Sequence, residues 1–124
     1  MNSKYIVLLD EFKRAFKKFE EIMKEKKTEI VRDSAIKRFE LTYELMWKTL
    51  KAYLEAKGIR VFSPKDAIRA AFQQGLIPEN DDWINIIDIR NLTVHTYKEA
   101  LAEEVYNDLK KYLPLIKNLI ENLS

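Results

Sequence analysis

Residues 81–98 contain the side chains whose types could carry out chemistry. The segment holds the only histidine of the chain, His95, together with Arg90 and Tyr97. An imidazole can take up and return a proton near neutral pH, and a guanidinium offers a permanent, forked charge that matches phosphate oxygens. These groups suit phosphoryl chemistry on a substrate that brings its own nucleophile, as RNA does with its 2′-hydroxyl. Such chemistry needs no metal ion or other cofactor, and we predict neither.

The position of Arg90 within this segment is unusual. If residues 81–98 form one helix, five large side chains lie within about 60° of Arg90: Trp83, Ile86, Ile87, Val94 and Tyr97. A charge on a face meant for burial costs on the order of several kcal/mol unless it is paired or faces a wet cleft. Arg90 is therefore a candidate anion-binding residue. The alternative is an ion pair with a carboxylate of a neighbouring helix, for which Glu40 and Glu44 are candidates.

A second, polar stripe runs alongside the first at roughly 100–160° from Arg90. It consists of Asp88, Asn91 and His95, which are spaced so that each contacts the next on a helix. This spacing predicts that Asp88 orients His95. Each residue alone also has an ordinary explanation, since a lone histidine on a helix flank is usually a surface residue and a tyrosine at a helix end usually packs.

The composition places the chain among helical proteins. Its 124 residues suffice for one domain with a single core, and 47% apolar and 34% charged residues with only two glycines suit a helical bundle. The absence of cysteine excludes disulfides and thiolate metal sites. The net charge of +2 permits phosphate-rich partners without requiring them. Because the first apolar run is interrupted at Asp10, too early for a signal or membrane segment, we expect a cytoplasmic protein without membrane association.

Periodic apolar residues and cap signals predict an all-α fold, an antiparallel up-and-down bundle of about five helices, four long and one short connector. Thr28 and Ser63 are predicted N-caps, and Gly58 is a predicted C-terminal stop. Pro114 interrupts the last apolar seam, so we expect a kink there or two shorter helices. The expected helices are residues 5–26, 29–57, 64–74, 81–98 and about 101–123.

The segment Arg90–Tyr97, RNLTVHTY, is an R-x4-H-x-Y motif placed late in a helical bundle. With it the chain resembles the HEPN domain, specifically the toxin subunit of MNT–HEPN toxin–antitoxin pairs, a group that includes nucleotidyltransferase substrate-binding proteins. The likeness covers nearly all of residues 1–124, which we take as a single HEPN-like domain. Further stretches also resemble that group: Arg38–Glu40, Tyr43–Lys48, Gly58–Ile59, Ser63–Pro64 and Phe72–Ile77.

The resemblance implies a homodimeric, metal-independent endoribonuclease that acts on RNA, with tRNA as a candidate. Carried over to this sequence, His95 would be the general base or acid for attack by the 2′-hydroxyl, and Arg90 would stabilise the charge growing on the phosphorane oxygens. Asn91 would orient the histidine or the phosphate. Tyr97 would be the residue that a cognate MNT-type nucleotidyltransferase, the antitoxin, modifies with a nucleotide to silence the enzyme.

The geometry of one helix raises a difficulty for this mechanism. On a straight helix Arg90 and His95 point about 140° apart, so a two-fold axis or a local distortion would be needed to bring them to one phosphate. Two other functions stay open. The first is a non-catalytic subunit whose dimer cleft holds a nucleotide or substrate for the nucleotidyltransferase, and the second is a purely structural bundle.

Overall fold

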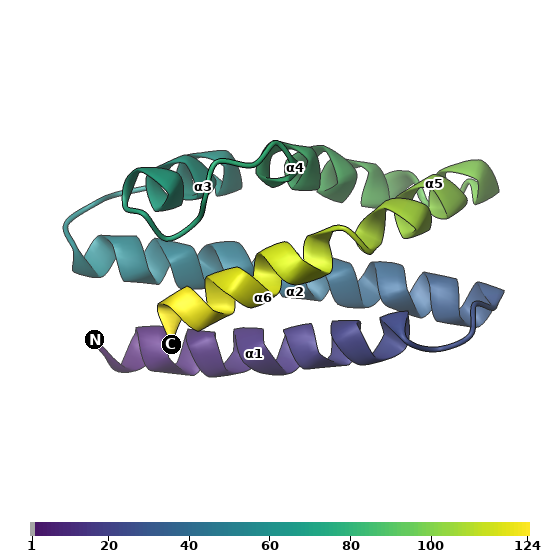
Figure 1. Cartoon of the computed structure of the whole chain (residues 1–124), viewed down its shortest axis with the longest axis horizontal. Coiled ribbons are helices and arrows are strands. Elements are labelled where there is room, and N and C mark those ends of the chain that lie inside the picture. The colour runs from purple at the N-terminus through teal and green to yellow at the C-terminus, as the bar shows by residue number, and fades with distance from the viewer. Residues whose placement is uncertain (1) are drawn as a thin grey trace.

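The computed structural model describes residues 2–124 as an all-α protein, and no strand occurs in this part of the chain. Figure 1 shows α1 and α2 antiparallel, α3, α4 and α5 in a row beyond α2, and α6 crossing this arrangement. The predicted all-α bundle is confirmed, with six α-helices in place of about five. Their bounds, with one short 3₁₀ helix, are α1 Ser3–Met23, α2 Glu29–Ala56, α3 Pro64–Gln73, α4 Asp82–Leu92, η1 Thr93–His95, α5 Glu99–Leu109 and α6 Tyr112–Leu123.

The ends of α2 and α3 lie where local chemistry predicts them. The Thr28 hydroxyl accepts a hydrogen bond from the Val31 amide at 3.1 Å, and the Ser63 hydroxyl accepts one from the Asp66 amide at 3.1 Å. At the end of α2, Gly58 has a φ of +80°, which glycine tolerates without steric cost. The backbone amide of Ile59 donates a hydrogen bond of 2.9 Å to the carbonyl of Leu54, the bond that defines a Schellman motif.

The last predicted helix is divided into α5 and α6, as the proline suggested. Pro114 is the third residue of α6 and therefore lies in its first turn. A proline is tolerated there because the first amides of a helix have no intrahelical partner. The chain changes direction at Lys110 and Lys111, between the two helices.

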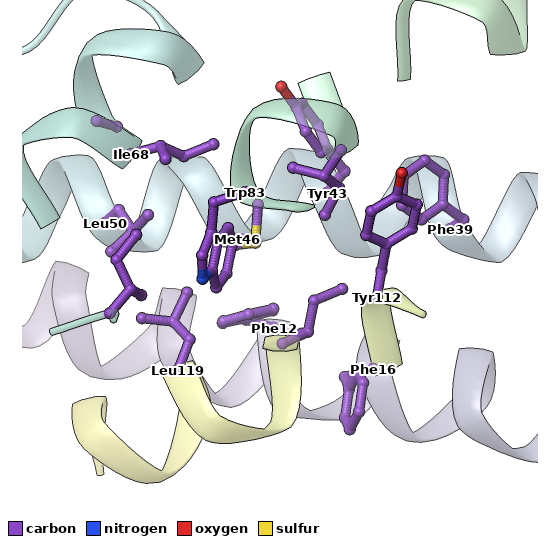
Figure 2. Packing of buried hydrophobic residues seen from close by; sticks show 14 of the residues in the cluster. Phe12, Phe16, Phe39, Tyr43, Met46, Leu50, Ile68, Trp83, Tyr112 and Leu119 are labelled. Carbon is purple, nitrogen blue, oxygen red and sulfur yellow. The ribbon is translucent and has the colours of Figure 1, made fainter. Parts of the chain in front are cut away.

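The core is a single cluster of buried apolar side chains to which all six α-helices contribute. Figure 2 shows part of it, with Phe12 of α1, Met46 of α2, Trp83 of α4 and Leu119 of α6 pointing toward the same interior. The hydroxyl of Tyr5 donates a buried hydrogen bond of 2.6 Å to the Leu123 carbonyl and so joins the first helix to the end of the last. This frame holds α4 in place.

The prediction of one helix over residues 81–98 is wrong at its C-terminal part, because α4 ends at Leu92 and a 3₁₀ turn follows. The hydroxyl of Thr93 donates to the Arg90 carbonyl at 2.7 Å, and the hydroxyl of Thr96 donates to the Thr93 carbonyl at 2.8 Å. Such local side-chain bonds compete with helical backbone bonds. Val94 and Tyr97 consequently leave the apolar stripe and are 59% and 76% exposed.

Candidate functional site

Arg90 lies half-buried near the C-terminal end of α4. Its guanidinium donates a hydrogen bond of 3.2 Å to the Thr93 hydroxyl. Burial raises the pKa of the neighbouring Tyr43 phenol to about 12, and the positive charge of Arg90 opposes part of this rise. Within residues 2–124 no ion pair involves Arg90. The alternative of an internal ion pair is therefore not found.

Within residues 2–124, neither of the carboxylates proposed as alternative partners for Arg90 pairs with it. Glu44 forms an ion pair of 3.3 Å with Lys48 and accepts a hydrogen bond of 3.2 Å from the Trp47 indole. Glu40, also in α2, lines a cavity that borders Tyr97. The guanidinium of Arg90 thus keeps donor capacity for an anion.

His95 and Tyr97 lie together on the exposed turn between α4 and α5. Their ring centroids are 6.4 Å apart and the rings meet edge to face, at 65°. The ammonium group of Lys98 lies 5.9 Å from the centre of the Tyr97 ring, on its face. The turn therefore presents an imidazole, a phenol and an ammonium group to solvent at one place.

The remaining predicted site residues, Asp88 and Asn91, are exposed on α4. Across residues 2–124 no hydrogen bond joins either of them to His95. The predicted contact assumed a continuous helix, whereas a 3₁₀ turn rotates each residue by about 120° instead of 100°. That rotation places Arg90 and His95 roughly 160° apart, so the observed distortion does not bring them together within one chain.

Arg32 of α2 anchors the turn between α4 and α5 at the end that leads into α5. The sequence analysis did not identify this residue. Its side chain is only 4% exposed, and its guanidinium donates to both carboxylate oxygens of Glu99 at 2.7 and 3.2 Å. It also donates to Glu103 at 3.0 Å and to Asp33 at 3.0 Å. Glu99 is the first residue of α5, so this cluster fixes α5 to the start of α2 just beyond Tyr97.

Two of the carboxylates around Arg32, those of Glu99 and Glu103, are stabilised in their charged form, which lowers the pKa of each. The hydrogen bond from Arg32 lowers the pKa of Glu99. The pKa of Glu103 is also lowered, first by a hydrogen bond from Lys27 and then by one from Arg32. A signal existed in the sequence, since Glu99 and Glu103 are four apart and share one helix face, but nothing local identified their partner.

One cavity borders the site, and a second lies against the N-terminal half of α4. A polar one of about 300 Å³ lies beside Tyr97 and is lined among others by Lys37, Glu40 and Thr96. An apolar one of about 390 Å³ lies between α3 and α4. On its rim Ile84 is 64% exposed, although it is a large apolar side chain. Within the part of the chain described, no group of three or more histidine, cysteine or acidic side chains could hold a metal ion.

The family model described as "Nucleotidyltransferase substrate binding protein like" matches residues 8–124. The chain belongs to this family. The predicted resemblance to nucleotidyltransferase substrate-binding proteins is thereby confirmed, and the description associates members of the family with nucleotidyltransferases. In the helices that the structure describes, none is both long and apolar enough to cross a membrane.

Two proteins with solved structures share the fold of this chain. A Thermus thermophilus protein of known crystal structure is 37% identical, with a TM-score of 0.81 over 90% of this chain and 98% of that one. A Haemophilus influenzae protein, described as revealing the fold of a substrate binding domain of a nucleotidyltransferase, is 28% identical. Its TM-score is 0.80 over 93% of this chain and 98% of that one.

This chain is also similar to a Haemophilus influenzae protein that is named "Probable ribonuclease HepT". It is 35% identical over 94 residues, which are 72% of this chain and 64% of that protein. The aligned part therefore spans just under two thirds of the relative's length.

Proposed function

We propose that this protein is a metal-independent endoribonuclease that works as a homodimer, with tRNA as a candidate substrate in the cytoplasm. The observation that carries the proposal is the state of Arg90, a half-buried cation with no carboxylate partner within residues 2–124, directly before the turn that presents His95. The name of the ribonuclease relative supports the same chemistry.

In the proposed reaction, the 2′-hydroxyl oxygen of RNA attacks the adjacent phosphorus while His95 takes or returns the proton. The bond from phosphorus to the 5′-oxygen breaks, which leaves a 2′,3′-cyclic phosphate and a free 5′-hydroxyl. Arg90 stabilises the charge that grows on the phosphorane oxygens. Asn91 orients the phosphate or the imidazole, and Asp88 would orient His95 of the facing chain.

A second copy of the chain would complete the site. Because Arg90 and His95 diverge within one protomer, a two-fold axis beside α4 would let each cation meet the imidazole of the other chain. The exposed apolar side chains of Ile84 and Val94 support this arrangement, since a dimer through α4 would remove both from water.

The decisive experiment incubates purified protein with tRNA in the presence of EDTA and analyses the fragment ends. We expect fragments with 2′,3′-cyclic phosphate ends, lost in His95→Ala and reduced by a factor on the order of 100 or more in Arg90→Ala, as for removal of one transition-state donor. Lys117→Ala, which removes an exposed cation of α6, is the matched control and should cleave normally. Intact tRNA with wild-type protein would refute the ribonuclease.

We further propose that a partner nucleotidyltransferase silences the enzyme at Tyr97. The phenolic oxygen would attack the α-phosphate of a nucleoside triphosphate, so that a nucleotidyl group is attached and pyrophosphate leaves. The exposed position of Tyr97 supports this, because its ring is reachable and lies edge to face with His95. The added phosphate would bring negative charge and bulk to the cleft.

Co-expression with a nucleotidyltransferase encoded in the adjacent reading frame tests the modification. The intact mass should rise by whole nucleotidyl units, and Tyr97→Phe should abolish the increase while cleavage persists. Tyr106→Phe, in which another partly exposed tyrosine is changed, should still be modified. An unchanged mass of the wild type would contradict this part of the proposal.

The alternative is a non-catalytic subunit that presents a nucleotide or substrate to the nucleotidyltransferase. It is favoured by the family's description and by that of the Haemophilus influenzae structure. In that case tRNA stays intact, whereas a nucleoside triphosphate binds and Arg90→Ala weakens its binding.

A further inference from the structure

Positive charge gathers around the connection between α2 and α3, as it also does at residues 13–18 of α1. Residues 51–69 contain five lysines or arginines and two acidic residues, a net charge of +3, whereas the whole chain carries only +2. The remainder of the sequence is therefore net negative. Figure 1 shows this connection at one end of the bundle.

A phenylalanine projects into solvent in the middle of this basic segment. The side chain of Phe62 is 78% exposed, while Val61 before it is buried in the core and the hydroxyl of Ser63 after it caps α3. Both neighbours are thus fixed, and the ring is held outward on a rigid connection. Packing gives no reason for a large aromatic side chain at this position.

Phe62 borders a hollow of about 560 Å³ whose other walls are mostly charged. The lining includes Lys51, Glu55 and Arg60, and of these the two cations outnumber the acid. An apolar protein segment would be a poor occupant, because it would desolvate these charges without pairing them. An aromatic face surrounded by cations instead matches a polyanion that carries flat rings.

We propose that Phe62 is a stacking platform for an unpaired base of single-stranded RNA, whose phosphates contact Arg60 and Lys51. Aromatic faces bind bases by stacking without regard to sequence, and cations around them follow the phosphate backbone. The inference rests on the proposed function insofar as the RNA bound here is also the substrate. It assigns to the protein a second contact with that substrate, outside the R-x4-H-x-Y motif.

The platform lies far from the proposed catalytic turn. The cavity beside Tyr97 is lined by α2 residues up to Glu40, whereas Phe62 follows the end of α2 at Ala56. With a rise of about 1.5 Å per residue, these parts of α2 are roughly 25 Å apart. The base on Phe62 is therefore not at the scissile bond, and only an RNA strand of several nucleotides can reach both places.

The test measures fluorescence anisotropy of a labelled single-stranded RNA of about 20 nucleotides with the full chain in the His95→Ala background, which prevents cleavage. Phe62→Ala should weaken binding roughly 5- to 100-fold, the range for loss of one base–aromatic stack, and Phe62→Trp should retain it. Arg60→Gln should reduce the slope of log affinity against log salt by about 0.7, as for one lost phosphate contact on a single strand. Ile30→Ala and Lys117→Gln, exposed residues outside the basic segment, are the matched controls.

Equal RNA affinities of Phe62→Ala and its parent would overturn the platform, and so would a parent protein that binds no RNA. If Phe62→Ala instead disrupts only a complex with the nucleotidyltransferase, the surface binds protein and the inference is wrong. A tetranucleotide substrate separates the two proposals, because it cannot reach Phe62 from the catalytic turn. Its cleavage by both wild type and Phe62→Ala supports the ribonuclease alone, whereas Phe62-dependent binding without any cleavage supports the platform alone.

Discussion

Thr93→Val tests how the end of α4 is built, since valine keeps the shape of threonine and replaces only its hydroxyl with a methyl group. In the structure this buried hydroxyl donates to the Arg90 carbonyl at 2.7 Å and accepts from the Arg90 guanidinium at 3.2 Å. We expect the substitution to lower the free energy of unfolding and to release the Arg90 side chain.

The magnitude follows from what each group loses. The Arg90 carbonyl keeps a second donor, the backbone amide of Thr93, so the loss of its hydroxyl partner costs about 0.5–1.5 kcal/mol. The guanidinium is half exposed and regains water, so its contact adds less than about 1 kcal/mol. The sum is about 1–2 kcal/mol, equivalent to roughly 3–10 °C in Tm for a domain of this size.

Urea unfolding followed by circular dichroism measures this change, with Thr93→Ser as the matched control because it keeps the hydroxyl. On the proposed function, Thr93→Val should also lose cleavage of tRNA by more than its unfolded fraction accounts for. A Thr93→Val protein as stable and as active as wild type would refute the argument that this hydroxyl positions Arg90.

Three further predictions concern the frame and the dimer. The pKa of Glu99 is lowered by Arg32, and that of Glu103 by Lys27 and then by Arg32, both below the ordinary value of 4.5. Stability should therefore be full above about pH 4.5 and fall as the pH drops through the lowered values. Arg32→Met should flatten this dependence in urea midpoints measured from about pH 3 to 6, and an unchanged profile would contradict the assignment. Ile84→Asp should give a monomer in light scattering and abolish tRNA cleavage while circular dichroism still shows a folded helical chain, whereas a persistent dimer would place the interface elsewhere. Tyr5→Phe should lower the free energy of unfolding by about 1 kcal/mol, the ordinary cost of one buried hydrogen bond, and urea denaturation that shows no change would argue against that bond.

The parts of the fold that could be predicted from the sequence are those decided by neighbours in the chain. The caps at Thr28 and Ser63 and the stop at Gly58 each depend on a few adjacent residues, and the structure has them in place. The end of α4 is also local, but it depends on whether the hydroxyl of Thr93 turns back to a carbonyl. Apolar periodicity contains no information about that choice.

The Arg32 cluster could not be predicted, because its bonds to Glu99 and Glu103 join residues 67 and 71 positions apart. Among the many charged residues of the chain, pattern alone selects no such pair. The candidate site residues were identified by type and motif. Their divergence within one protomer was already expected from a straight helix, whereas the 3₁₀ turn that exposes Val94 and Tyr97 was not.

The two anchors of this turn bear on how a modified tyrosine would silence the enzyme. On one side Thr93 is hydrogen-bonded to Arg90, and on the other side Arg32 holds Glu99 through hydrogen bonds of 2.7 and 3.2 Å. A turn fixed at both ends cannot swing away to accommodate a nucleotidyl group on Tyr97. The added group would therefore remain beside His95, where its phosphate competes with the RNA phosphate for the same cations. In this proposal, inhibition needs no conformational change, only occupation of the cleft by an anion attached at its edge.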